Sequence, residues 1–155
     1  MKRVLILALL ALCCLSGCAH NISEQSRSQA DMSIPFGSLF RDPDAYKGKF
    51  VILGGRIADK TPLEDGTQLE VVQYSLDGME SPNESSVSGG RFLAVVPASL
   101  AAPVCRSGML VSMAGEVVGK KVQQDYGYPV IAVKELHVIS SDEGTSIPTW
   151  TPNVR

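Results

Sequence analysis

Few side chains in this sequence are of types that could carry chemistry. The chain has four cysteines and two histidines. A cysteine can act as a nucleophile, a metal ligand, a disulfide partner or a point of covalent attachment, and its surroundings decide among these roles. Three of the cysteines fall within the first 18 residues, and Cys18 directly follows the small residues Ser16 and Gly17. That setting favours covalent attachment at Cys18.

The residues before Cys18 have the three parts of a secretory signal. Lys2 and Arg3 are followed by an apolar run over residues 4–15 and then by the two small residues. The run is too short to span a bilayer as a permanent helix. Because the segment resembles a bacterial lipobox, we expect cleavage before Cys18, a diacylglycerol on its thiol and an acyl group on its new amine. An ordinary cleaved signal with a chance cysteine is the alternative.

Several acyl chains on one residue anchor a protein stably, whereas a single chain binds only reversibly. The fold itself then has no need to enter lipid. Ala19 follows Cys18, at a position where the resemblance to sorted lipoproteins implies that an aspartate would signal retention in the inner membrane. We therefore expect a lipid-anchored protein of the outer membrane, on its periplasmic face.

Removal of residues 1–17 would leave 138 residues, enough for one domain with a substantial core. Lys plus Arg then falls to 12 against 16 Asp plus Glu, a net charge of about −4. No basic tract remains, so we expect no nucleic-acid partner. Residues 18–33 are expected to be the lipidated cysteine and a flexible tether, residues 34–139 the domain, and residues 140–155 a polar C-terminal tail.

The remaining candidates for catalysis and metal binding are isolated in the sequence. His20 lies in the expected tether and should face solvent, while His137 should be a partly exposed residue near the end of the last strand. Neither is set in a catalytic motif, and the two distant histidines with the one remaining cysteine supply no short spacing of metal ligands. At Cys105 we expect a small semi-buried hydrophobe rather than a reactive or intermolecularly paired thiol. The sequence predicts a protein that is not an enzyme, with no catalytic residue, metal site or cofactor besides the lipid.

The elements that must position these residues are predicted strands, rich in β-branched and aromatic residues and bounded by turn formers. In the fourth strand apolar and more polar residues alternate, which is typical of a half-buried strand. Residues 36–46 and 97–102 predict short helices. The five predicted strands cover residues 50–57, 68–76, 91–96, 109–118 and 128–138.

Two of these segments, 48–57 and 108–117, resemble each other, and each has a glycine inside the strand, Gly55 and Gly115. A glycine there permits a sharp bend or a close backbone approach, as a small barrel requires. The pattern favours an all-β fold, a small five-stranded Greek-key barrel like the oligonucleotide/oligosaccharide-binding (OB) barrels, with one or two short helices. A β-sandwich is the alternative.

An ordered series of motifs over residues 34–139 resembles the Slp family. These are outer-membrane lipoproteins of Gram-negative bacteria associated with starvation or stationary phase. The resemblance implies an outer-membrane lipoprotein that supports the envelope under stress, and it leaves the biochemical activity open. It rests on Phe36-x-x-Leu39, Pro43-x-x-Tyr46-x-Gly48-x-x-Val51-x-x-Gly54-Gly55-x-Ile57, Gly66-Thr67-x-Leu69-Glu70-Val71-x-Gln73, Leu76-Asp77, Gly90-Arg91-Phe92, the run from Gly108 through Gly115-Glu116-Val117, and Tyr126-x-Tyr128-Pro129.

Tyr74, Arg91, Tyr126 and Tyr128 are the best candidates for ligand binding. On one barrel face their rings would stack on sugars or bases, and the arginine would fix an anionic group. The simpler interpretation is that the tyrosines cover the barrel ends with their hydroxyl groups in water. We expect a structural or partner-binding module with an envelope protein or glycan as partner, and the alternative is a module that binds a glycan, oligonucleotide or small ligand through this face.

Overall fold

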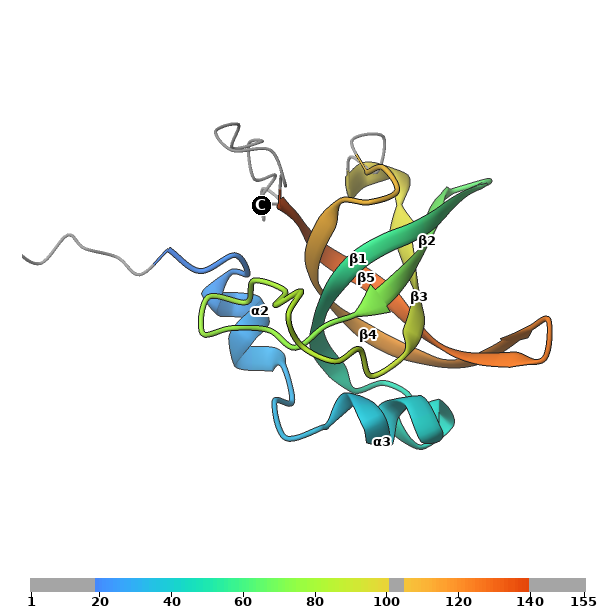
Figure 1. The fold of residues 1–155 in the computed structure, drawn as a ribbon, viewed down its shortest axis with the longest axis horizontal. Coiled ribbons are helices and arrows are strands. Elements are labelled where there is room, and N and C mark those ends of the chain that lie inside the picture. The colour runs from blue at the N-terminus through green and yellow to red at the C-terminus, as the bar shows by residue number, and fades with distance from the viewer. Residues whose placement is uncertain (1–18, 101–104, 140–155) are drawn as a thin grey trace, which may run out of the picture.

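The computed structural model describes residues 19–100 and 105–139, which form a closed five-stranded barrel (Figure 1). Around the barrel the order is β1-β2-β3-β5-β4, with β4 pairing again with β1. Neighbouring strands are antiparallel except β3 and β5, which are parallel. The predicted OB-type barrel is confirmed. The strands are β1 Phe50–Leu63, β2 Gly66–Gln73, β3 Arg91–Pro97, β4 Leu110–Gln123 and β5 Tyr126–Ile139.

Several predicted features lie outside the described residues. They are the signal at residues 1–17, the lipidation site Cys18, the polar tail at residues 140–155 and the end of the short helix expected at residues 97–102.

The barrel interior is filled by alternate residues of the five strands, as the period of an extended chain requires. Cys105, which precedes β4, joins this core and is fully buried, so it lies deeper than the semi-buried position that the sequence predicts. The strand residues of the core are Val51, Leu53, Ile57, Leu69, Val71, Phe92, Ala94, Val96, Val111, Met113, Val117, Ile131 and Val133.

Glycines allow neighbouring backbones to approach where the barrel bends. A Cβ atom on Gly55 of β1 would collide with the carbonyl oxygen of Val72 on β2. A Cβ atom on Gly115 of β4 would likewise collide with the carbonyl oxygen of Ala132 on β5. The close approach predicted at these two glycines is therefore confirmed.

Short helices cover one end of the barrel. Helix α3 (Phe36–Arg41) and the 3₁₀ turn η2 (Pro43–Tyr46) precede β1, and Figure 1 shows α3 below the barrel. Leu39 of α3 is buried in the core. A second 3₁₀ turn, η3 (Ala98–Leu100), follows β3. The predicted short helices are confirmed where the structure describes them. Within residues 19–100 and 105–139, no helix is long and apolar enough to cross a membrane.

Two hairpins extend well beyond the predicted strand ends. The hairpin of β1 and β2 turns at residues 64–65, and that of β4 and β5 turns at Gln124 and Asp125, both of which have positive φ (48° and 66°). Two positive φ angles define the type I′ turn, whose twist matches that of antiparallel strands. The hairpin tips were missed because their side chains are exposed on both faces and show no apolar alternation.

The flexible tether expected at residues 18–33 is wrong for the described residues of that segment. Helix α2 spans Glu24–Gln29, and the Oγ atom of its N-cap Ser23 accepts a hydrogen bond from the backbone N–H of Ser26. Ile22 is only 1% exposed and packs with Ile52 and Ala114 on the outer surface of β1 and β4. The folded unit therefore begins well before Ile34.

The same packing corrects the description of β4 as half-buried. Ser112 and Ala114 point away from the core, yet both are 0% exposed. Ile22 packs against Ala114, and the hydroxyl of Ser112 donates a hydrogen bond to the backbone oxygen of Glu80. Both faces of this stretch of β4 are thus covered.

Two glycine substitutions, one at a close backbone approach and one in open space, together test the role of glycine in closing the barrel. We expect Gly115→Ala to lower the free energy of unfolding by about 2 kcal/mol or more, because the backbones of β4 and β5 must separate. Gly37→Ala, in helix α3 with open space around the added methyl group, should raise it by about 0.5–1 kcal/mol. Urea unfolding followed by circular dichroism measures both. Equal effects of the two substitutions would contradict this account.

Candidate functional site

Three of the four predicted binding residues converge around Glu70 on the outer face of the barrel. The guanidinium of Arg91 donates to Glu70 Oε1 at 2.7 Å, and the hydroxyl of Tyr128 donates to the same oxygen at 3.3 Å. The backbone N–H of Arg91 donates to the hydroxyl of Tyr126 at 3.3 Å. We call these four residues the Glu70 cluster.

Strand register explains the convergence. Arg91 of β3 lies opposite Val72 of β2, so Glu70, two residues along, projects from the same face. The parallel pairing of β3 with β5 begins at Leu93 and Val130 and brings Tyr128 beside them. Leu93 is 0% exposed although it is not part of the core cluster, so side chains also cover the outer face here.

Aromatic rings extend the Glu70 cluster inward. The ring centroids of Tyr126 and Tyr128 are 4.4 Å apart at 54°, and Tyr126 contacts Phe40 at 5.7 Å. Phe40 contacts Phe36 at 6.0 Å, and Phe36 meets the core residue Phe92 edge-on at 6.1 Å. A continuous row of ring contacts therefore connects the two tyrosines to the barrel core.

The charges of the Glu70 cluster balance one another. The hydrogen bond to Glu70 raises the pKa of Arg91, so the guanidinium stays charged. Burial, followed by the nearby Glu70 charge, raises the pKa of Tyr128, so the phenol stays neutral at physiological pH. Since the cation of Arg91 already has an anionic partner, the cluster suits a neutral, ring-shaped ligand better than an anion.

Tyr74 lies apart from the Glu70 cluster. It is the residue after the end of β2, where its backbone N–H donates to the carbonyl of Gly54 and its carbonyl accepts from the side chain of Gln73. Within the described residues it has no ring contact or hydrogen bond with Arg91, Tyr126 or Tyr128. The structure shows direct contacts among three of the four predicted residues, and Tyr74 does not take part in them.

A second polar cluster, centred on Glu80, was not predicted. Glu80 lies in the loop between β2 and β3 with φ 59°, a conformation rare for residues other than glycine. Its carboxylate is only 8% exposed and pairs with His20 Nδ1 at 3.1 Å and with Arg27 Nε at 3.1 Å. The expectation that His20 faces solvent is therefore wrong, because this buried carboxylate needs partners.

Glu135 of β5 holds the start of α2. Its carboxylate accepts hydrogen bonds from the backbone N–H and the hydroxyl of Ser23, both at 2.7 Å, and from the hydroxyl of Ser26. A carboxylate at the first turn of a helix is also favoured by the helix dipole. Glu80 from the loop between β2 and β3 and Glu135 from β5 thus fix the N-terminal segment in place.

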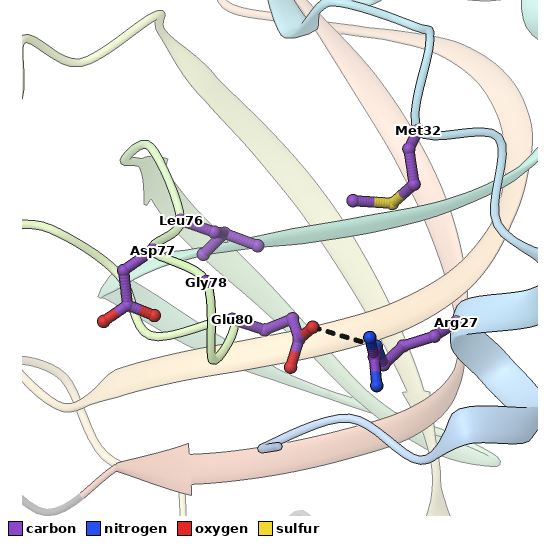
Figure 2. A pocket seen from close by; sticks show the side chains of 6 residues that line it. All are labelled: Arg27, Met32, Leu76, Asp77, Gly78 and Glu80. Atoms are coloured by element: carbon purple, nitrogen blue, oxygen red, sulfur yellow. Dashed lines mark ion pairs between the residues drawn. The ribbon is translucent and has the colours of Figure 1, made fainter. Parts of the chain in front are cut away.

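A pocket of about 330 Å³ opens between α2 and the loop after β2 (Figure 2). The ion pair of Arg27 and Glu80 forms its polar side, and Met32 and Leu76 form its apolar side. As with the Glu70 cluster, the cation is already paired. The lining residues are Arg27, Met32, Leu76, Asp77, Gly78 and Glu80.

The sequence did contain one signal of the N-terminal docking. Ile22 is a single apolar residue directly before Ser23, which is the arrangement of a hydrophobic residue ahead of a serine N-cap. No comparable pattern marks Glu80 or Glu135, whose roles depend on contacts across the barrel.

The other two ionisable candidates, His137 and Cys105, lie in surroundings that disfavour their charged forms. Burial lowers the pKa of His137, only partly offset by the charge of Glu135, and its Nδ1 atom is buried without a hydrogen-bond partner. Burial raises the pKa of the Cys105 thiol. Among the residues that the structure describes, no three His, Cys, Asp or Glu side chains are grouped as metal ligands would be.

A model of the outer membrane lipoprotein Slp family matches residues 15–152. The chain belongs to this family. The predicted resemblance and the predicted outer-membrane location are both confirmed by this match. Slp family membership does not assign a molecular role to the Glu70 cluster or to the pocket.

Comparison with other proteins adds little to the Slp family assignment. A search of curated protein sequences found no match. Among solved structures the barrel is similar to Schizosaccharomyces pombe Pot1pC bound to single-stranded DNA, with a TM-score of 0.36 and 9% sequence identity, over 63% of this chain and 82% of that one. At that level of similarity the DNA ligand is a property of that protein alone.

The docking of the N-terminal segment can be tested by removing its acceptor. We expect Glu135→Ala to increase amide hydrogen exchange at residues 21–27 about tenfold or more, because it removes charge-assisted hydrogen bonds worth about 1.5–3 kcal/mol each before solvent screening. Glu116→Ala on the exposed face of β4 is the matched control and should leave that exchange unchanged. Identical exchange in both variants would refute the docking role of Glu135.

Proposed function

We propose that the mature chain is a non-enzymatic binding module on the periplasmic face of the outer membrane. In this proposal Cys18 carries an N-acyl group and an S-diacylglycerol. The barrel holds a partner protein or an envelope glycan, and the module supports the envelope in starvation, stationary phase or other stress. Slp family membership supports the membrane anchoring, and the arrangement of the barrel's own side chains supports the binding role.

The proposal rests on one observation, the pairing of ionisable side chains with one another within the fold. Glu80 is paired with His20 and Arg27, and Glu70 is paired with Arg91. An acid, base or nucleophile must be free to exchange a proton with a substrate or a neighbouring group. These groups instead neutralise one another and fix the fold, which favours a scaffold over a catalyst.

The Glu70 cluster is the surface that we assign to the partner. Tyrosine and arginine are enriched where protein interfaces carry most of their binding energy, because each combines a large apolar area with polar groups at its end. Tyr126 and Tyr128 are already ordered by their ring contacts. A pre-ordered surface loses little conformational entropy on binding.

Crosslinking in intact cells followed by affinity purification tests the proposal. We expect Tyr126→Ala combined with Tyr128→Ala to reduce recovery of the partner about tenfold, equivalent to about 1.4 kcal/mol. Val118→Ala combined with Val122→Ala is the matched control, since both valines are exposed on the same hairpin. Equal recovery from the two double variants would contradict the assignment of the surface, and no protein or glycan above the level of Cys18→Ala would contradict the proposal.

A second candidate function is binding of a small neutral glycan by the Glu70 cluster. The convergence of Arg91, Tyr126 and Tyr128 favours it, because sugars bind on fixed aromatic faces with polar groups at the edge. An oligonucleotide is less well suited, since the mature chain is negative and Arg91 is already neutralised.

NMR titration with envelope oligosaccharides and short oligonucleotides separates these ligands. For a glycan we expect chemical-shift changes confined to the Glu70 cluster, and about tenfold weaker binding in Tyr126→Ala. Tyr74→Ala is the control, because Tyr74 lies away from the cluster and should leave the affinity unchanged. Absence of shift changes with every compound would rule out the ligand hypothesis.

A further inference from the structure

The first described residues of the chain are fixed to the barrel one after another. His20 pairs with Glu80, and the Ile22 side chain is buried in the second apolar cluster. Between them the backbone N–H of Asn21 donates to the carbonyl of Met79 at 3.1 Å, and its side-chain amide donates to the hydroxyl of Ser81 at 2.8 Å. The chain is therefore held from residue 20 onward.

This docking limits how far a lipid on Cys18 can be from the barrel. Two residues of extended chain span at most about 7 Å, which is the greatest Cα distance between Cys18 and His20. The headgroup layer of one leaflet is about 5–7.5 Å thick, half the difference between the total bilayer thickness and its hydrocarbon core. If the acyl chains are in the hydrocarbon, this short connection keeps the barrel surface beside His20 close to the headgroups.

The surface beside His20 is the turn at residues 76–81. Met79 at its tip is 56% exposed, and Met32, across the pocket, is 70% exposed. Exposed methionines are flexible and apolar, and they suit the disordered boundary between headgroups and acyl chains. Figure 1 shows this loop beside α2, on the side away from the tips of the two long hairpins.

We infer that the turn at residues 76–81, together with the start of the N-terminal segment, is a membrane-facing surface that rests on phospholipid headgroups, with Met79 at the contact. The inference rests on the proposed lipidation of Cys18. It gives the barrel a defined orientation, in which the hairpin tips point away from the bilayer. The carboxylates of Glu80 and Glu135 act as positioning residues, since they hold the segment that follows the lipid.

Fluorescence quenching measures this orientation directly. The lipidated protein is reconstituted into vesicles of phosphatidylethanolamine and phosphatidylglycerol that contain a nitroxide on the headgroup. A bimane label is placed on Met79→Cys and, as the matched control, on Leu63→Cys in the distal hairpin, where the side chain is also exposed. Cys105 is 0% exposed, so the unsubstituted protein gives the labelling background. We expect about half of the fluorescence to be lost at position 79 and little at position 63.

A linker variant keeps the anchor and removes the short connection. Ten Gly and Ser residues inserted between Cys18 and Ala19 have a root-mean-square length of about 16–19 Å. We expect this variant to remain bound to the vesicles while quenching at position 79 falls to the level at position 63. Retention of strong quenching only at position 79 with the linker in place would show that the turn binds headgroups by itself, and would overturn the role of the short connection.

Two results separate the failure of this inference from the failure of the proposed anchoring. Lipid found on Cys18 by mass spectrometry, with flotation of the protein but equal quenching at both positions, would overturn the orientation and leave the anchoring intact. Absence of lipid on Cys18 would overturn both.

Discussion

The fold depends on the ability of one strand to pair with two partners in succession. β1 pairs with β4 over residues 50–56 and with β2 over residues 55–63, so the chain must bend where the two ladders overlap. Gly55 occupies that overlap and leaves no room for a side chain against β2. Gly115 permits a similar close approach between the backbones of β4 and β5. Because the closed barrel holds the core inside, the outer faces of its strands are available to bind the N-terminal segment and to form the Glu70 cluster.

The strand cores and the bending glycines were predictable because they follow from local chemistry. Alternating apolar residues and flanking turn formers are visible without any knowledge of neighbours. The hairpin tips were not, since residues exposed on both faces carry no alternation. Ser112 and Ala114 on β4 show the other limit. Ala114 is covered by Ile22, about ninety residues earlier, and Ser112 donates a hydrogen bond to the backbone oxygen of Glu80, 32 residues earlier, so no pattern within the strand reports their burial.

Some residues of the candidate site could likewise be predicted from the sequence, and others could not. Tyr126 and Tyr128 alternate along one strand, so their common face could be predicted, and Arg91 joined them through strand register. Glu70 could not be identified as the central acceptor, because its role appears only when β2, β3 and β5 are side by side. Tyr74 follows the last paired residue of β2, where alternation no longer determines direction. The predicted exposure of His20 is wrong because one buried apolar residue, Ile22, and the carboxylates of Glu80 and Glu135 are enough to order a polar segment.

The buried Cys105 has a consequence for how this protein tolerates an oxidising compartment. Its thiol is packed in the core, and burial raises its pKa, so both access and the reactive thiolate are suppressed in the folded state. Mixed disulfides with other proteins can then form only after the structure around Cys105 opens. The rate at which a thiol reagent modifies Cys105 in the folded protein therefore reports how often the barrel opens, and this measurement needs no added probe.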